Sequence, residues 1–188
     1  MTILAIECSS AIGSVAITKD GDPLHQRTFE NPRGRGTGFF TALAETSRLT
    51  DTFDLIIVGT GPGSYNSLRV SIASAWGLAR AREVPLRGLC SLLGYKASEY
   101  HVLGDARANQ WFHAHICDGS LVTPPSLHTP EAALSRLTPG VPVFSTSPLL
   151  ESILCEPPQA IQLARRFEKA GMAEPIYLKP PHITKPAC

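Results

Sequence analysis

The sequence is poor in charge, and the charges that it has are nearly balanced. Charged residues make up 18% of the 188 residues, and the formal net charge is +1. So small a net charge gives no global electrostatic attraction to nucleic acids or to anionic membranes. An intrinsically disordered chain is also excluded, because apolar residues amount to 43% of the composition. Any contact with RNA would therefore depend on a local patch or on a partner.

The sequence also lacks a cysteine pattern and a long apolar run. Its five cysteines are scattered and never occur as C-x-x-C, which argues against a zinc site or a disulfide framework and favours a reducing compartment. There is no basic and apolar leader, and no apolar run reaches the roughly 20 residues that span a bilayer. We therefore expect a cytoplasmic protein without a membrane anchor.

No complete set of catalytic residues is apparent. The glycine-rich turn at residues 59–63 is not followed by the Gly-Lys-Ser/Thr of a P-loop. His113 and His115 share one face of an expected strand, but a metal site needs three or four ligands and no others converge. Cys8 has no identifiable histidine base. Ordinary surface or core roles explain the two histidines better than metal binding.

The sequence does contain a clear alternation of strands and helices. Strands are expected at residues 2–7, 14–18, 23–29, 54–58 and 84–89, and helices at 39–49, 67–82 and 91–100. Three strands with short turns, followed by alternating helices and strands, predict an α/β layered fold. The strand at residues 23–29 has mixed polarity and is therefore expected near an edge of the sheet.

The second half of the chain is predicted to form a smaller lobe. Strands are expected at residues 101–105, 110–117 and 121–127, and short helices at 130–137, 148–154 and 158–170. These helices begin with or just after proline, which suits a first helical turn. We predict a first lobe at 1–98 and a second at 99–188, whose C-terminal part can pack back on the first.

The helix expected at residues 67–82 is the most informative element. Its apolar residues cover nearly the whole circumference, whereas an amphipathic surface helix needs only one apolar stripe. Ala73, Gly77 and Ala81 recur every four positions and form a ridge that another helix can approach closely. Gly77 costs about 1 kcal/mol of helix propensity relative to alanine, which suggests a steric reason for it. We expect burial on two sides, either inside a three-layer domain or against another molecule.

Two short polar stretches could bind a phosphate or Mg²⁺. The candidates are Glu7, Ser9 and Ser10 after the first strand, and Gly61, Gly63 and Ser64 in the glycine-rich turn. A carboxylate and hydroxyls can ligate a metal ion, and a helix N-terminus can bind an anion. Serines at such positions more commonly satisfy the backbone groups of turns.

Four segments of the sequence resemble the landmarks of the TsaB (YeaZ) family. They are ILAIECSSAIGSVAI at 3–17, GPGSYNSLRVSIASAWGLA at 61–79, GDARANQWFHAHI at 104–116 and EPIYLK at 174–179. They occur in the family order over nearly the whole chain. The resemblance implies the actin-like, sugar-kinase-like (ASKHA) fold, with two lobes, a mixed sheet flanked by helices, and here a truncated second lobe.

The resemblance also implies a role in making threonylcarbamoyladenosine beside the tRNA anticodon. TsaB-like proteins are non-catalytic partners of TsaD, the related subunit that transfers the threonylcarbamoyl group, and the ATPase TsaE joins these two. A homodimer is implied when TsaD is missing, together with only indirect contact with tRNA. No nucleotide is expected on the chain alone, although ATP or ADP is possible at the interface of the complex.

In that family the two helices of the first lobe meet the equivalent pair of the partner. The partner-binding residues implied here are Phe39, Phe40, Leu43, Leu68, Arg69, Ile72, Ala73, Trp76, Gly77 and Arg80.

The chain departs from the family pattern at several positions. Glu7-Cys8-Ser9 stands where Asp-Thr-Ser is usual, so phosphate or metal binding at this turn is not implied. No histidine lies between Gln26 and Tyr100, so the H-x-x-x-H metal site of TsaD cannot be carried over. The alternative function is a small ATP-dependent phosphotransferase or hydrolase of the same superfamily.

Overall fold

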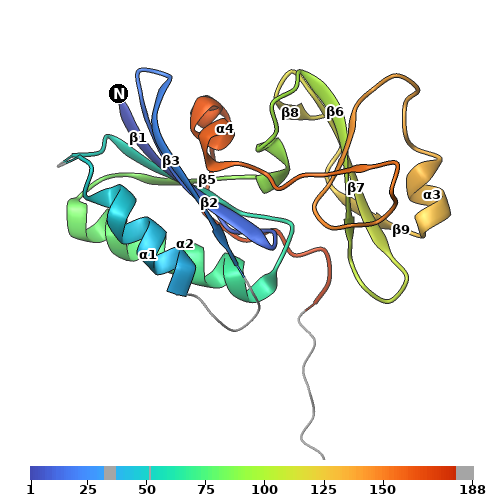
Figure 1. The fold of residues 1–188 in the computed structure, drawn as a ribbon, viewed down its shortest axis with the longest axis horizontal. Coiled ribbons are helices and arrows are strands. Elements are labelled where there is room, and N and C mark those ends of the chain that lie inside the picture. Colours follow the sequence, from blue (N-terminus) through green and yellow to red (C-terminus); the bar gives the residue numbers. More distant parts are fainter. Residues whose placement is uncertain (32–36, 51, 181–188) are drawn as a thin grey trace, which may run out of the picture.

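A computed structural model describes residues 1–31, 37–50 and 52–180, which form two β-sheets with helices around and between them (Figure 1). The first sheet contains β1 (Thr2–Glu7), β2 (Ile12–Lys19), β3 (Asp22–Glu30), β4 (Leu55–Gly59) and β5 (Leu86–Leu89). Its strand order is β3-β2-β1-β4-β5. The first three strands pair antiparallel, whereas β4 and β5 run parallel to β1.

Local sequence explains this order. Strands β1 and β4 are almost entirely buried, as expected of apolar strands that are covered on both faces. Strand β3 is mostly exposed and lies at the edge, as predicted. Asp20 and Gly21, both with positive φ, make the tight turn into β3.

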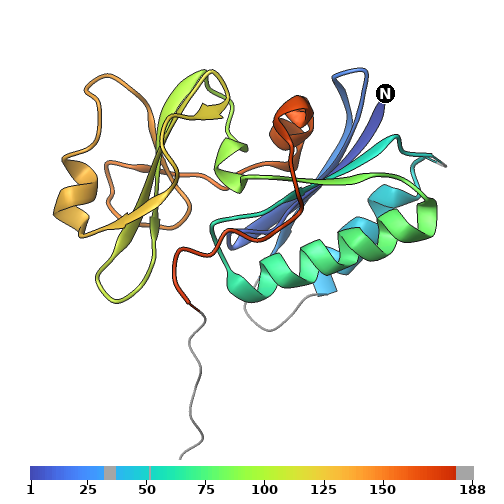
Figure 2. The same cartoon turned by 180° about the vertical axis from the view of Figure 1, so that it is seen from behind.

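Helices cover both faces of the first sheet. Helices α1 (Thr37–Ser47) and α2 (Tyr65–Arg82) lie side by side on one face (Figures 1 and 2). Helix α4 (Ala160–Arg165), followed by the 3₁₀ turn η2 (Phe167–Lys169), lies on the other face. The backbone N–H of Ala160 donates to Ser14 Oγ of β2 (2.9 Å). The C-terminal part thus returns to the first sheet, while the lobe boundary at residue 98 stays a prediction.

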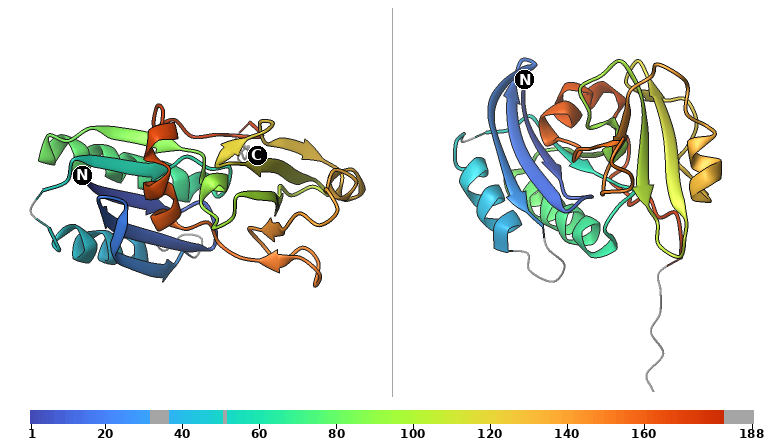
Figure 3. Two further views of the ribbon diagram at one scale, coloured as in Figure 1. Left: turned by 90° about the horizontal axis from the view of Figure 1, so that it is seen from above. Right: turned by 45° about the vertical axis from the view of Figure 1, so that its right-hand side comes forward.

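The second sheet lies beside the first, with α4 between them (Figure 3). Its strands are β6 (Glu99–Asp105), β7 (Trp111–Cys117), β8 (Ser120–Leu121), β9 (Ser126–His128), β10 (Val143–Ser145) and β11 (Leu154–Cys155). The strand order is β11-β10-β6-β7-β8, and β9 also pairs with β7. The short helix α3 (Pro130–Leu134) packs against β7 and β9.

The structure corrects several predicted elements. The helix expected at residues 91–100 is only a 3₁₀ turn, η1 (Ser91–Leu93), because Gly94 closes the turn and Glu99 already pairs with β7. The strand expected at 121–127 is split by Pro124 and Pro125, which cannot donate ladder hydrogen bonds. No helix forms at 148–154, and the helix expected at 158–170 is interrupted after Arg165.

The described residues form two large hydrophobic cores and a third, smaller cluster around Leu103, Ala133 and Ile153. One lies between the sheets and joins Ile57 of β4, Leu163 of α4 and Ala114 of β7. The other packs Phe39 of α1 and Ala75 of α2 against the first sheet. Within the described ranges, no helix is long and apolar enough to cross a membrane.

Candidate functional site

In the described part of the chain, helix α2 is covered on one side only. Leu68, Ile72, Ala75 and Ala79 are buried beneath it. On the opposite side, Trp76 is 57% exposed and Val70 is 41% exposed. The expected second apolar side therefore exists, and none of residues 1–31, 37–50 and 52–180 covers it.

Gly77 lies on this uncovered side without any internal reason for being glycine. A Cβ atom built at Gly77 would have no neighbouring atom within 4 Å. The residue is helical and does not have positive φ. Its cost of about 1 kcal/mol relative to alanine is therefore not offset by packing inside this chain. Close approach by another molecule is the steric reason that remains.

The adjacent helix α1 adds a second exposed aromatic residue. Phe39 is buried against Phe29, whereas its neighbour Phe40 is 52% exposed. Because α1 and α2 lie on the same face of the sheet (Figure 2), their outer sides form one surface. We call this surface the α1/α2 face and define it by the exposed residues Phe40, Arg69, Val70, Ala73, Trp76, Gly77 and Arg80.

The structure divides the predicted partner-binding residues into two groups. Those exposed on the α1/α2 face are Phe40, Arg69, Ala73, Trp76, Gly77 and Arg80. Phe39, Leu68 and Ile72 are buried, and Leu43 is half-buried, so these residues support the helices from within. Sequence reasoning missed Val70, although its position seven residues before Gly77 places both on one side of the helix.

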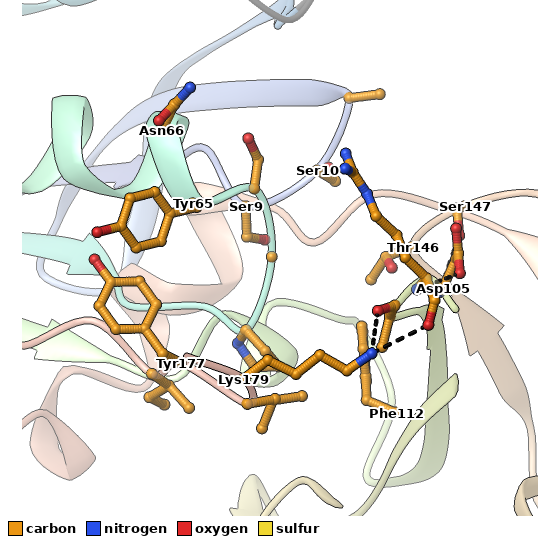
Figure 4. A pocket seen from close by; sticks show the side chains of 18 of the residues that line it. Ser9, Ser10, Tyr65, Asn66, Asp105, Phe112, Thr146, Ser147, Tyr177 and Lys179 are labelled. Atoms are coloured by element: carbon orange, nitrogen blue, oxygen red, sulfur yellow. Dashed lines mark hydrogen bonds between the residues drawn. The ribbon is translucent and has the colours of Figure 1, made fainter. Parts of the chain in front are cut away.

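The end of β1 and the glycine-rich turn meet at a cleft between the two halves of the molecule. The cleft has a volume of about 680 Å³. Ser9, Ser10, Gly63 and Ser64 line it from the first half. Asp105, Arg107, Thr146 and Ser147 line it from the second, and Tyr177 and Lys179 from the C-terminal part (Figure 4).

The glycines of the turn serve close backbone approach. A Cβ at Gly63 would collide with the carbonyl oxygen of Ser9, and the N–H of Ser64 donates to that oxygen (2.8 Å). Gly61 has a φ of +90°, which favours glycine. Gly61 does not line the cleft, so only Gly63 and Ser64 of the predicted turn residues face it.

Glu7 is not exposed to the cleft. Its side chain is fully buried, and Oε1 accepts a hydrogen bond from the N–H of Ser9 (2.6 Å). A side chain at Gly59 would collide with Glu7 Oε2, so this glycine makes room for the carboxyl group. Burial raises the pKa of Glu7, although the nearby Ser9 and Ser91 oppose the shift. A carboxyl group enclosed in this way does not reach a metal ion or phosphate in the cleft.

Cys8 is similarly enclosed. Burial, together with the nearby Glu7, raises the pKa of the Cys8 thiol well above its ordinary value. The thiolate is the nucleophilic form of cysteine, so this residue is poorly suited to covalent catalysis.

Residues near the C-terminus form a third wall of the cleft, and the sequence did not predict that they belong to a site. Residues 171–179, which we call the C-terminal strap, run from the first sheet to the second. Gly171 pairs with Gly88 next to β5, and the N–H of Ile176 donates to Thr60 O (2.8 Å). Tyr177 packs on Tyr65 of α2, with ring centroids 4.8 Å apart. The only hint in the sequence was the family-like motif EPIYLK at residues 174–179.

Lys179 ties the C-terminal strap to the second half. Its Nζ donates to Ala106 O (2.8 Å) and Arg107 O (3.1 Å) in the β6–β7 hairpin (Figure 4).

His113 and His115 do lie on one face of β7, as predicted, and they stack with other histidines of the second sheet. Within the described residues, no group of three or more His, Cys, Asp or Glu side chains is arranged to hold a metal ion.

Solved structures define the class of protein. The structure of YeaZ from Pseudomonas aeruginosa superposes with a TM-score of 0.73 at 20% identity, covering 94% of this chain and 99% of YeaZ. A second P. aeruginosa structure, described as an uncharacterized protein with similarity to peptidase YeaZ, gives a TM-score of 0.71 at 21% identity, covering 95% of this chain and 99% of that one. The chain therefore has the α/β fold of these YeaZ structures.

Sequence comparisons point in the same direction. The family model described as TsaD: tRNA N6-adenosine threonylcarbamoyltransferase matches residues 39–130. The uncharacterized protein Rv3421c of Mycobacterium tuberculosis is 26% identical over 196 residues, covering 96% of this chain and 92% of that protein. The structural match to YeaZ and the match to the TsaD family model bear out the resemblance to the TsaB (YeaZ) family.

Proposed function

We propose that this chain is a non-catalytic subunit of tRNA threonylcarbamoyladenosine biosynthesis that binds a TsaD-like transferase through its α1/α2 face. The observation that carries the proposal is the exposed apolar side of α2, with Trp76 and an unconstrained Gly77. Contiguous exposed apolar surface of this kind marks a protein-binding site.

The match to the TsaD family model supports the choice of partner. The matched residues 39–130 include most of α1 and all of α2. A TsaD-like protein with an equivalent pair of helices could pack them against this pair, helix to helix. The same face would give a homodimer when the transferase is missing.

The proposal places the chain in a larger assembly. A TsaE-like ATPase would join the two subunits, ATP or ADP could bind at the interface, and tRNA would contact this chain only indirectly. The complex would act in the cytoplasm, where its tRNA substrate is found. The enclosed Glu7 carboxyl group and Cys8 thiol support a non-catalytic role.

The cleft between the two halves of the molecule favours the rival, an ATP-dependent phosphotransferase or hydrolase. It is lined by Ser9, Arg107 and Lys179, which could bind phosphate groups. Calorimetric titration of the isolated chain with Mg-ATP separates the two functions. Binding with turnover supports the rival, whereas no heat of binding supports the partner role.

The partner role is tested by changes on the exposed ridge of α2. Ala73→Glu and Gly77→Trp should each weaken binding to the TsaD-like protein of the same cell at least 100-fold, or about 2.7 kcal/mol, because they bury a charge or block close approach. Both positions are exposed, so the monomer should stay folded.

The matched control is Leu24→Glu on β3, where an apolar side chain that is 60% exposed lies outside the α1/α2 face. This variant should co-elute with the transferase as the parent does. Normal co-elution of both the Ala73→Glu and Gly77→Trp variants would refute the proposed binding face.

A further inference from the structure

Four histidines lie together on one face of the second sheet, on the side away from the core between the sheets. We call His101, His113, His115 and His128 the histidine cluster. His101 of β6 lies opposite His115 of β7 in the strand register, with ring centroids 4.4 Å apart. His113 stacks on His101 at 5.1 Å, and His128 of β9 lies 6.2 Å from His113. None of these residues belongs to the cleft or to the α1/α2 face.

Hydrogen bonds determine which ring nitrogens carry protons. The backbone N–H of Thr138 donates to Nε2 of His101 (3.1 Å), and a backbone N–H can only donate. Nε2 of His101 therefore holds a lone pair, and the ring proton is on Nδ1. Nδ1 lies 2.9 Å from Nε2 of His113, which must accept this hydrogen bond. The two hydrogen bonds that link Thr138 to His101 and His101 to His113 therefore exist together only while both histidine rings are neutral.

The surroundings do not favour a charge on these two rings, which are 1% and 6% exposed. The charged and titratable groups around them are Glu99 on β6, His115 on β7, His128 on β9 and Arg136 after α3. Glu99 Oε1 is bonded to His115 Nε2 (2.9 Å). Burial and the neighbouring imidazoles lower the pKa of His113 to about 4, and burial lowers the pKa of His101 although Glu99 opposes that shift.

The bond from Thr138 helps to hold one segment of the chain on the second sheet. Residues 129–142, which we call the α3 segment, comprise α3 and the turn after it. Apolar contact under this segment is made by Ala133, buried with Leu103 and Ile153, and by Leu137, which packs partly buried on the same cluster. The segment is further held by the Thr138 hydroxyl, 3.2 Å from His101 Nε2, and by Pro142 O, which accepts from the N–H of His101 (2.9 Å).

We propose that the histidine cluster is a pH-dependent contact between the α3 segment and the second sheet. Its neutral rings hold the α3 segment on the sheet, and protonation of His101 or His113 releases the segment. A second proton on His101 places an N–H group against the N–H of Thr138, so this bond is lost and only the Thr138 hydroxyl can still pair with Nε2. A second proton on His113 turns its Nε2 into a donor, which forces His101 to reverse its tautomer and produces the same clash. Release therefore accompanies the uptake of at least one proton.

The pH dependence follows from this linkage. Released histidines titrate near their ordinary pKa of about 6.5, whereas the held rings stay neutral to lower pH. The released population should therefore rise as pH falls below about 6.5, by up to about tenfold per pH unit for each proton taken up. Above that pH both states bind equal numbers of protons, and the population should be constant.

Trp111 provides a reporter for this release, because it packs partly buried at the apolar contact under the α3 segment. The chain has two tryptophans, so a Trp76→Phe background leaves Trp111 as the single emitter. Its emission wavelength should shift to the red reversibly between pH 6.5 and 4.5, without loss of far-UV circular dichroism. Wavelength is the correct readout, because protonated His128, opposite Trp111 in the register, can quench intensity without any release.

Variants of the cluster decide the cause of the shift. The double variant His101→Gln/His113→Gln carries amides that do not titrate and should lose the wavelength shift, whereas His25→Gln on β3 should keep it. A constant wavelength in the parent background, or an unchanged shift in the double variant, overturns the proposal. If the double variant does not fold, NMR of the unaltered chain decides. The chemical shift of the Thr138 amide must then change with pH at the titration midpoint of His101 or His113. A Thr138 amide shift that follows neither midpoint overturns the proposal.

Discussion

At the scale of single residues, Glu7 was a candidate for binding phosphate or Mg²⁺, but its side chain is part of the protein interior. The side chain is fully buried, with Oε1 bonded to the N–H of Ser9 and Oε2 without a hydrogen-bond partner. An ionised carboxylate is costly in such a place. The raised pKa of Glu7 follows from that cost.

Glu7→Gln should stabilise the protein more at pH 8 than at pH 5.5. Because the folded pKa of Glu7 is raised, its contribution to stability is complete below the unfolded pKa and is lost as pH rises through the folded value. A neutral amide removes this loss, and we expect a gain of about 1–2 kcal/mol in the free energy of unfolding at pH 8.

The measurement is urea unfolding of both proteins at the two pH values, with the exposed Glu151→Gln as control. A destabilisation by Glu7→Gln that grows with pH would show that the carboxylate is charged and needed in the fold.

At the scale of elements, α2 carries a glycine that its own molecule does not need. Gly77→Ala should raise the free energy of unfolding of the isolated chain by about 0.5–1 kcal/mol, because alanine is the better helix former and a Cβ there meets no atom. Thermal unfolding measures the change. Lower stability of the variant would indicate that glycine serves an internal purpose, which would weaken the argument for a neighbouring molecule.

The C-terminal strap is a second element with a testable role. Arg107, Ala108 and Asn109 all have positive φ, between 52° and 62°, and this conformation is unfavourable for residues other than glycine. Lys179 Nζ bonds two carbonyls of this hairpin turn. We infer that Lys179 helps to hold the turn in its strained conformation.

Lys179→Met should therefore speed hydrogen exchange of the Ala106 and Gln110 amides by about tenfold, since a hydrogen bond to a charged group contributes about 1.5 kcal/mol or more. Lys169→Met is the matched control, because Lys169 Nζ also bonds a backbone carbonyl, that of Asp118, but not the hairpin turn. Equal exchange in the parent and in Lys179→Met would remove this role from Lys179.

Some of the secondary-structure elements could be predicted from the sequence, and others could not. The elements of the first sheet were predictable, because buried strands such as β4 are continuous apolar runs and α2 has a clear boundary at its glycines. Strands β10 and β11 were not, because they are only three and two residues long, and β10 depends on pairing with distant β6 while β11 depends on pairing with β10. The same holds for the strap, where an unremarkable lysine gains its role only through a hairpin 72 residues away.

The candidate site followed a similar rule. Helical periodicity predicted that α2 is apolar on two sides, because that property belongs to the helix itself, and it left open whether this chain or another molecule covers the second side. The residues that line the cleft were harder to predict. Glu7 is excluded from the cleft because its side chain packs against Gly59, and the sequence alone did not indicate this contact.

At the scale of the whole molecule, the two sides of the first sheet have different partners. One side is covered by α4 and by the core shared with the second sheet. The other is covered by α1 and α2, and no other described element lies over their outer surface (Figure 1). A second molecule could therefore dock on the α1/α2 face without disturbing the cleft or the second sheet.

Hydrogen exchange of the chain, alone at a monomeric concentration and bound to its TsaD-like transferase, tests the central claim most directly. We predict that protection on binding concentrates in peptides covering residues 37–47 and 65–82, while β6, β7 and β9 exchange as in the free chain. Unchanged exchange over both helices, with protection appearing on the second sheet instead, would contradict the account.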